Sequence, residues 1–156
     1  MKILHDRFAK LTTALTVLAI TACLAAPTFA AEFVSVKKDG VNIRSGPGTN
    51  MEILWEVFRD YPLKVVSHRA KWAQVVDFEG DQGWVYSPLL SQAKTVIVKV
   101  KTANMRVGPG KDYEILATVK YGVVFKLVEQ DGNWVKVLHD DGTSGWIYSK
   151  LVWPAD

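Results

Sequence analysis

One segment of about 60 residues occurs twice in this chain, and this repeat limits the fold more than any other feature. The motif VNIRSGPG at residues 41–48 returns as ANMRVGPG at residues 103–110, and the offset of 62 residues holds without a gap to residue 152. Residues 41–90 and 103–152 share 19 identical positions out of 50. A unit of this length exceeds the roughly 20–45 residues of solenoid repeats. We therefore predict two small domains with one architecture.

Each unit contains short stretches rich in β-branched and aromatic residues, which is typical of strands. The stretches lie at residues 33–36, 62–66, 71–76 and 83–86 in the first unit and at 96–100, 123–128, 133–138 and 145–148 in the second. Turn residues such as Asp131-Gly132 separate them, and no stretch has a helical period. We expect an all-β fold of two tandem small barrels at residues 31–91 and 92–156. Each barrel should have about five short antiparallel strands, because closure hides the strand edges.

The first thirty residues are predicted to lie outside this fold. A basic start precedes the uncharged stretch at residues 11–26, and residues 28–30 (TFA) have the small-x-small pattern of a cleavage site. We interpret residues 1–30 as a secretory signal peptide. A retained membrane helix is the alternative, because the whole uncharged run, residues 11–31, is 21 residues long and could span a bilayer.

The one cysteine of the chain, Cys23, lies in this leader. Its context ITAC resembles a bacterial lipobox, in which the cysteine carries a lipid and becomes the new N-terminus. The apolar and small residues that follow Cys23 favour soluble export instead. We predict a periplasmic or extracellular protein, with a lipid anchor at Cys23 as the alternative. Membrane contact is then expected only through the leader or that lipid, and residues 31–156 have no cysteine for a disulfide.

Charge argues against a nucleic-acid partner. Residues 31–156 contain 16 Lys and Arg against 15 Asp and Glu. Binding to phosphate backbones needs a basic face that releases counterions. A balanced, exported chain is not expected to have this function.

The exported part offers no recognisable catalytic or metal-binding constellation. Its two histidines, His68 and His139, occupy non-equivalent repeat positions, and neither has a His or Cys neighbour at metal-ligand spacing. The sequence His139-Asp140-Asp141 falls in a predicted hairpin turn, where charged residues are normally solvated. We therefore predict no catalytic residue, no metal and no cofactor, and we expect a protein that is not an enzyme.

The repeated motifs resemble the bacterial SH3-like (SH3b-type) domain. The resemblance rests on an early Asn-x-Arg-x-Gly-Pro-Gly loop, a central tryptophan before a strand, and a terminal Gly-Trp-[Val/Ile]-x segment. Both units contain all three in this order, and the resemblance covers about residues 33–152. It implies two SH3-like barrels. It also implies a binding role: recognition of peptidoglycan or its peptides, targeting of wall hydrolases, or protein contacts. The expected partner is peptidoglycan or an envelope protein.

The repeated loop is predicted to be a structural turn, since proline fixes φ and glycine permits positive φ on either side of it. The turn residues are Asn42, Gly46, Pro47, Gly48, Asn104, Gly108, Pro109 and Gly110. A backbone nest for an anion is the alternative, although no helix pattern follows. Arg44 and Arg106 fit two roles, as a brace for the loop or as a clamp for a ligand carboxylate.

A shallow ligand groove is expected beside this loop. Tryptophans at matching positions of the two units, residues 72 and 134 and residues 84 and 146, are predicted to be core, because two small cores need large side chains. Other aromatic residues are assigned to the groove together with the arginines. The predicted groove residues are Arg44, Trp55, Tyr86, Arg106, Tyr113 and Tyr148.

These features predict an exported, non-catalytic binding protein of the bacterial envelope. Its SH3-like modules would recognise peptidoglycan, wall peptides or an extended protein segment. A structural or regulatory scaffold that holds another envelope protein without wall affinity is the first alternative. A small wall hydrolase at the domain interface is the second.

Overall fold

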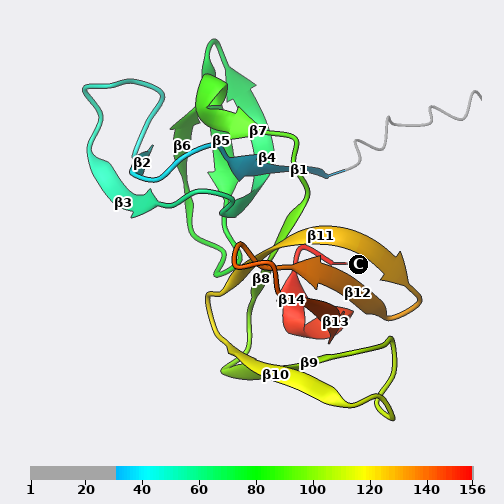
Figure 1. Ribbon diagram of the computed structural model, residues 1–156. Helices are drawn as coiled ribbons and strands as arrows, with labels where there is room; N and C mark the ends of the chain where they lie inside the picture. The colour runs from blue at the N-terminus through cyan, green and yellow to red at the C-terminus, as the bar shows by residue number, and fades with distance from the viewer. Residues whose placement is uncertain (1–30, 156) are drawn as a thin grey trace, which may run out of the picture.

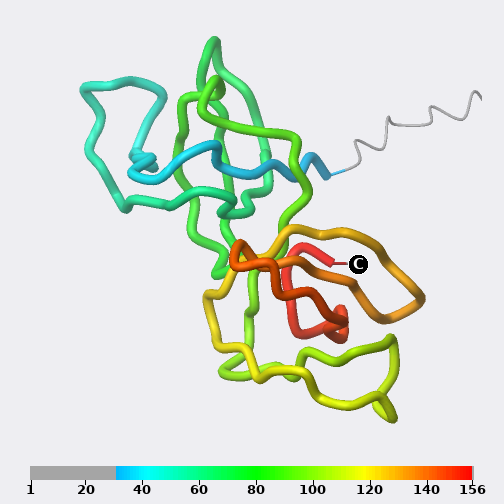
Figure 2. The backbone as a smooth tube through the Cα atoms, in the orientation of Figure 1, coloured from blue at the N-terminus to red at the C-terminus, as the bar shows by residue number. Residues whose placement is uncertain are grey.

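The computed structural model describes residues 31–155. The predicted signal peptide and Cys23 lie outside the described residues. Two seven-stranded antiparallel sheets, one from each repeat, make up the described part (Figure 1). Residues 92–94 connect them, and Figure 2 shows the chain passing from one half to the other through this link. The prediction of an all-β fold with two tandem domains is confirmed.

The two sheets repeat one topology. The first sheet contains β1 (Glu32–Val36), β2 (Val41–Arg44), β3 (Ile53–Val57), β4 (Pro62–Arg69), β5 (Trp72–Val76), β6 (Gln82–Tyr86) and β7 (Leu90–Ser91). The second contains β8 (Thr95–Val98), β9 (Thr102–Arg106), β10 (Ile115–Lys120), β11 (Val124–Asp131), β12 (Trp134–Leu138), β13 (Ser144–Tyr148) and β14 (Val152–Trp153). Their orders, β3-β2-β6-β5-β4-β1-β7 and β10-β9-β13-β12-β11-β8-β14, correspond strand for strand. Each sheet has seven strands, more than the five or so expected. The strands that the sequence stretches did not include are β2 and β3 with their counterparts β9 and β10, which flank the Gly-Pro-Gly loops, and the two-residue strands β7 and β14.

Two short 3₁₀ turns, η1 (Ser87–Leu89) and η2 (Ser149–Leu151), precede β7 and β14. Neither turn, nor any other stretch among the described residues, forms a helix of the length and apolar character needed to cross a bilayer.

Bulges occur at the same place in both sheets. The register of β4 on β5 shifts between Val65 and Ser67, and that of β11 on β12 shifts between Leu127 and Glu129. Bulges of this kind bend a strand and increase its twist, which helps a small sheet to curl on itself. The repeat therefore preserves the curvature of the sheet as well as its residues.

Strand alternation separates a core from an outer face. In β2, Val41 and Ile43 are buried, whereas Asn42 and Arg44 are only half-buried. In β6, Val85 is buried and the flanking aromatic residues are half-buried. This period of two places the polar and aromatic residues of these strands together on the outer side.

Each sheet encloses its own cluster of mostly aliphatic side chains. The first cluster consists of Val34, Val36, Val41, Ile43, Val57, Tyr61, Leu63, Val65, Ala73, Val75, Val85 and Ile97. The second consists of Val96, Val98, Ala103, Met105, Phe125, Val135, Val137, Ile147 and Val152.

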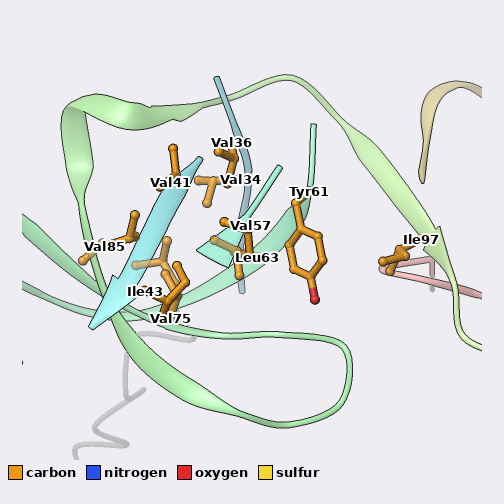
Figure 3. Close-up of a cluster of buried hydrophobic side chains, with 12 residues drawn as sticks. Val34, Val36, Val41, Ile43, Val57, Tyr61, Leu63, Val75, Val85 and Ile97 are labelled. Atoms are coloured by element: carbon orange, nitrogen blue, oxygen red, sulfur yellow. The ribbon is translucent and has the colours of Figure 1, made fainter. Parts of the chain in front are cut away.

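The domains share an interface. Ile97 belongs to β8 of the second sheet but packs with the first cluster, on the side where Tyr61 lies (Figure 3). Trp153, near the C-terminus, packs edge-on against Phe33 with ring centroids 5.4 Å apart. Trp153 therefore packs between the two domains.

Candidate functional site

The Gly-Pro-Gly loop is braced by arginine in both domains. Arg44 Nη1 donates a hydrogen bond to the Met51 carbonyl oxygen at 2.8 Å, and Arg106 Nη1 donates to the Tyr113 carbonyl oxygen at 2.7 Å. Each bond spans seven residues and closes the loop. Of the two roles predicted for these arginines, the brace is therefore present in both copies.

The glycines of this loop are needed for close approach. Positive φ was predicted for them, but the positive-φ glycines among the described residues lie elsewhere, so this part of the prediction is wrong. The side chain of residue i+5 packs on the loop instead. A Cβ at Gly108 would overlap the Tyr113 ring, and a Cβ at Gly46 would lie 3.0 Å from Met51 Sδ. Glycine is required because the loop folds under its neighbour's side chain.

An aromatic pair lies beside each loop. Trp72 of β5 and Tyr86 of β6 are register partners, with ring centroids 5.6 Å apart and ring planes at 61°. Trp134 of β12 and Tyr148 of β13 form the same pair at 5.6 Å and 60°. Pairs of aromatic rings at this distance and angle are favourable. Each domain thus presents a paired, half-buried aromatic surface.

These pairs line two grooves at corresponding positions, which we name groove 1 and groove 2. Groove 1, of about 230 Å³, is lined by Lys38, Gly40, Val41, Asn42, Arg44, Thr49, Trp72, Tyr86 and Leu89. Groove 2, of about 260 Å³, is lined by Thr102, Ala103, Asn104, Arg106, Lys111, Trp134, Tyr148 and Leu151. The asparagine, arginine, tryptophan, tyrosine and leucine are identical and 62 residues apart.

The structure places four of the six predicted groove residues together in this way, namely Arg44, Tyr86, Arg106 and Tyr148. The other two lie elsewhere. Trp55 of β3 is half-buried and packs against the first core. Tyr113 covers the Gly-Pro-Gly loop of the second domain, with 49% of its surface exposed.

Trp72 and Trp134, which were predicted to be core, are half-buried and line the grooves. Trp84 is also half-buried, whereas Trp146 is buried as predicted. The prediction of core tryptophans fails because smaller residues next to them on the same strand, such as Val85 beside Trp84, point inward and fill the core. The signal that would have found the grooves is cross-strand pairing, since a hairpin between β5 and β6 sets Trp72 opposite Tyr86.

A cleft of about 390 Å³ lies between the domains. Its charged groups contact one another: Asp60 lies 3.9 Å from Arg59 and 4.0 Å from Lys126, and Lys126 lies 3.3 Å from Asp140. Its histidine, His139, also lines the cleft. Of these three pairs, Asp60–Lys126 joins the two domains. Paired charges at a partly exposed surface contribute little to stability.

An acidic turn faces the second domain. Carboxylate oxygens of Asp77, Glu79 and Asp81 lie within 4.8 Å of one another, a spacing that a cation would accept. Asp77 Oδ1, however, accepts the backbone N–H groups of Glu79 and Asp81 at 2.9 and 3.0 Å, and Oδ2 accepts the Tyr61 hydroxyl at 3.4 Å. The buried Asp77 carboxylate therefore stabilises the turn through these hydrogen bonds.

Tyr121 of the second domain contacts the same turn. The Tyr121 hydroxyl donates a hydrogen bond to Glu79 Oε1, and its ring packs on Phe78 at 5.3 Å. The hydrogen bond to the Glu79 carboxylate raises the pKa of Tyr121 to about 12. Burial, together with the nearby Asp77, holds the pKa of Tyr61 above its usual range. Both phenols are thus protonated donors at neutral pH.

The model of the bacterial SH3 domain family matches residues 37–92 and, a second time, residues 99–154. The chain belongs to this family. The two matched ranges contain both Gly-Pro-Gly loops and both aromatic pairs, so grooves 1 and 2 are features of the two bacterial SH3 domains.

Among curated proteins, the chain is similar to "Putative N-acetylmuramoyl-L-alanine amidase YrvJ" of Bacillus subtilis (strain 168), with 28% identity over 128 residues. The alignment covers 75% of this chain and 24% of YrvJ. The bacterial SH3 chain thus spans about a quarter of the length of that relative.

Two solved structures show a weaker similarity. NlpC2 from Trichomonas vaginalis has 14% identity and a TM-score of 0.36, over 79% of this chain and 48% of that chain. An NlpC/P60 family protein from Bacillus cereus ATCC 10987 has 16% identity and a TM-score of 0.34, over 78% of this chain and 55% of that chain. Family membership rests on the two matched domains and not on these scores.

Proposed function

We propose that this chain is an exported, non-catalytic binding protein of the bacterial envelope and that grooves 1 and 2 bind peptidoglycan. The observation that carries the proposal is the duplication of one groove, with the same asparagine, arginine, tryptophan, tyrosine and leucine in both domains. Family membership and a relative named as a putative N-acetylmuramoyl-L-alanine amidase support an envelope role.

The chemistry of the grooves suits a wall polymer. Exposed aromatic faces pack against the apolar faces of sugars and against extended peptides, while asparagine and arginine supply hydrogen bonds. A shallow groove gives weak binding at each site. Two such sites on one chain gain affinity for a repeating polymer, because the second contact is intramolecular.

The proposal includes no catalytic step. The charged residues of the interdomain cleft contact one another, as Lys126 does with Asp60 and Asp140. A hydrolytic role there would require a carboxylate or nucleophile directed at a substrate. Release of soluble fragments from purified wall by the chain would contradict this part of the proposal.

Retention on purified peptidoglycan tests the proposed function. The exported chain, residues 31–156, should be retained at low salt, and the double variant Trp72→Ala with Trp134→Ala should be released. A matched control is Leu54→Ser with Leu116→Ser, since these exposed residues lie outside both grooves. Failure of the unaltered chain to bind any purified wall would overturn the proposal.

A scaffold role is the second candidate, and exposed apolar edges favour it. β3 and β10 lie at one edge of their sheets. Ile53 and Leu54 are 50% and 44% exposed, and their counterparts Ile115 and Leu116 are 47% and 49% exposed. Exposed edge strands can accept a strand from a partner protein. If the leucine double variant loses a crosslinked partner while wall binding is absent, the scaffold role is the correct one.

A further inference from the structure

The two grooves share a charge pattern that the alignment of the repeats does not require. Groove 1 contains Lys38 and Arg44, and groove 2 contains Arg106 and Lys111. Among the described residues, no aspartate or glutamate lines either groove. The chain as a whole is nearly balanced, with 16 basic against 15 acidic groups in residues 31–156. Each groove is therefore a local positive site on a surface of mixed charge.

The lysine of each groove comes from a different position. Lys38 of groove 1 corresponds to Val100 in the second unit, and Lys111 of groove 2 corresponds to Thr49 in the first. Each copy nevertheless has one arginine and one lysine at its groove. Because Lys38 and Lys111 occupy non-equivalent positions, the shared fold alone does not explain why each groove contains a lysine.

The positive charge lies beside an aromatic surface. The Trp72–Tyr86 pair and the Trp134–Tyr148 pair present ring faces and edges to the same space as the lysine and arginine. A ligand that uses both features has an apolar face for the rings and an anionic group for the cations. A carboxylate is the natural partner, because charge-assisted bonds to lysine and arginine are the stronger class of hydrogen bond.

We propose that grooves 1 and 2 select carboxylate-bearing fragments of peptidoglycan, namely sugar or stem-peptide units that keep a free carboxylate. This inference rests on the proposed function and adds the ligand class to it. The lysine and arginine bind the carboxylate, and the aromatic pair packs on the adjacent sugar or peptide. Wall polymers in which these carboxylates are converted to amides are poor ligands.

The first experiment compares two forms of one polymer. Peptidoglycan stripped of secondary phosphate polymers is divided, and half has its carboxylates converted to neutral amides with a carbodiimide and ammonia. The chain should bind the untreated half at least about tenfold more tightly, as expected for loss of charge-assisted bonds. Equal binding to both halves overturns the ligand class and leaves the proposed function intact. Binding that disappears with the phosphate polymers shows that phosphate is the anion and also overturns it.

Charge variants locate the effect. Lys38→Gln with Lys111→Gln should lower affinity for the untreated polymer by about tenfold and should not change affinity for the amidated one. The double variant Lys94→Gln with Lys120→Gln removes the same charge from two exposed positions outside both grooves and is the matched control. An equal loss in the control shows that net charge alone acts, which contradicts the inference.

A soluble probe keeps the inference testable if no polymer is retained. Muramyl dipeptide and its fully amidated form differ in charge, and both can be titrated into the chain while NMR follows the indole N–H signals of Trp72 and Trp134. Shifts with the acid and weak or absent shifts with the amide support the ligand class. Equal shifts, or none with either compound, overturn it.

Discussion

Replacing Arg44 with alanine removes the side chain that closes the Gly-Pro-Gly loop of the first domain. The lost bond joins a charged donor to the Met51 carbonyl oxygen over 2.8 Å. Hydrogen bonds to charged groups contribute about 1.5–3 kcal/mol when sheltered. This one lies at an exposed surface, so we expect the free energy of unfolding to fall by about 1 kcal/mol. In a domain of this size the change corresponds to a drop of about 4–8 °C in the melting temperature.

Thermal and urea unfolding, followed by tryptophan fluorescence, measure the effect. Arg106→Ala removes the equivalent bond of the second domain and should cost a similar amount. The double variant should lose about the sum, since distant sites are additive within about 0.5 kcal/mol. Arg69→Ala, at an exposed position of β4, is the control and should change stability by less than about 0.5 kcal/mol. If Arg44→Ala costs no more than this control, the arginine is not a brace.

Three other substitutions test the packing and the interface. Gly145→Ala places a Cβ 2.9 Å from the Arg106 carbonyl oxygen and should destabilise the chain by about 1–3 kcal/mol in calorimetry; an unchanged melting temperature would contradict the close approach. Ile43→Ala, at a fully buried side chain, should cost about 2–5 kcal/mol in urea unfolding, and a cost below 1 would contradict the core assignment. Tyr121→Phe should remove a phenol of pKa about 12 from the alkaline absorbance titration. Because that pKa is raised above 10.0 by Glu79, the contribution of the bond is complete below pH 10 and is lost as the pH rises through about 12; a phenol that titrates near 10 would contradict the bond.

The repeat was enough to predict the architecture. Identical spacing of the Gly-Pro-Gly loops and of the Gly-Trp segments indicated two copies of one fold. Turn residues between short stretches rich in β-branched residues indicated that this fold consists of strands. The asparagines of the motif were not placed on strands: Asn42 and Asn104 were assigned to the turn, whereas they lie in β2 and β9. There they alternate with buried residues, so both asparagines line the grooves. The repeat therefore gave the fold class and the domain number, but not the strands that flank the Gly-Pro-Gly loop.

The rest depends on contacts between strands, which the residue pattern within any one strand does not contain. Trp72 meets Tyr86 only when β5 pairs with β6, and burial of the neighbouring valines leaves Trp72 on the outer side. The contact between the domains is even harder to predict from the sequence. Phe78 and Tyr121 correspond to Asp140 and Arg59 in the other unit, so comparison of the two repeats gives no signal for them.

The stoichiometry of binding tests the central claim, that the two domains carry equivalent sites for one ligand. Isothermal titration of residues 31–156 with a short soluble muropeptide should give two sites per chain. Trp72→Ala and Trp134→Ala should each leave one site, and the double variant should leave none. A single site in the unaltered chain, or two sites that survive both substitutions, would contradict the account.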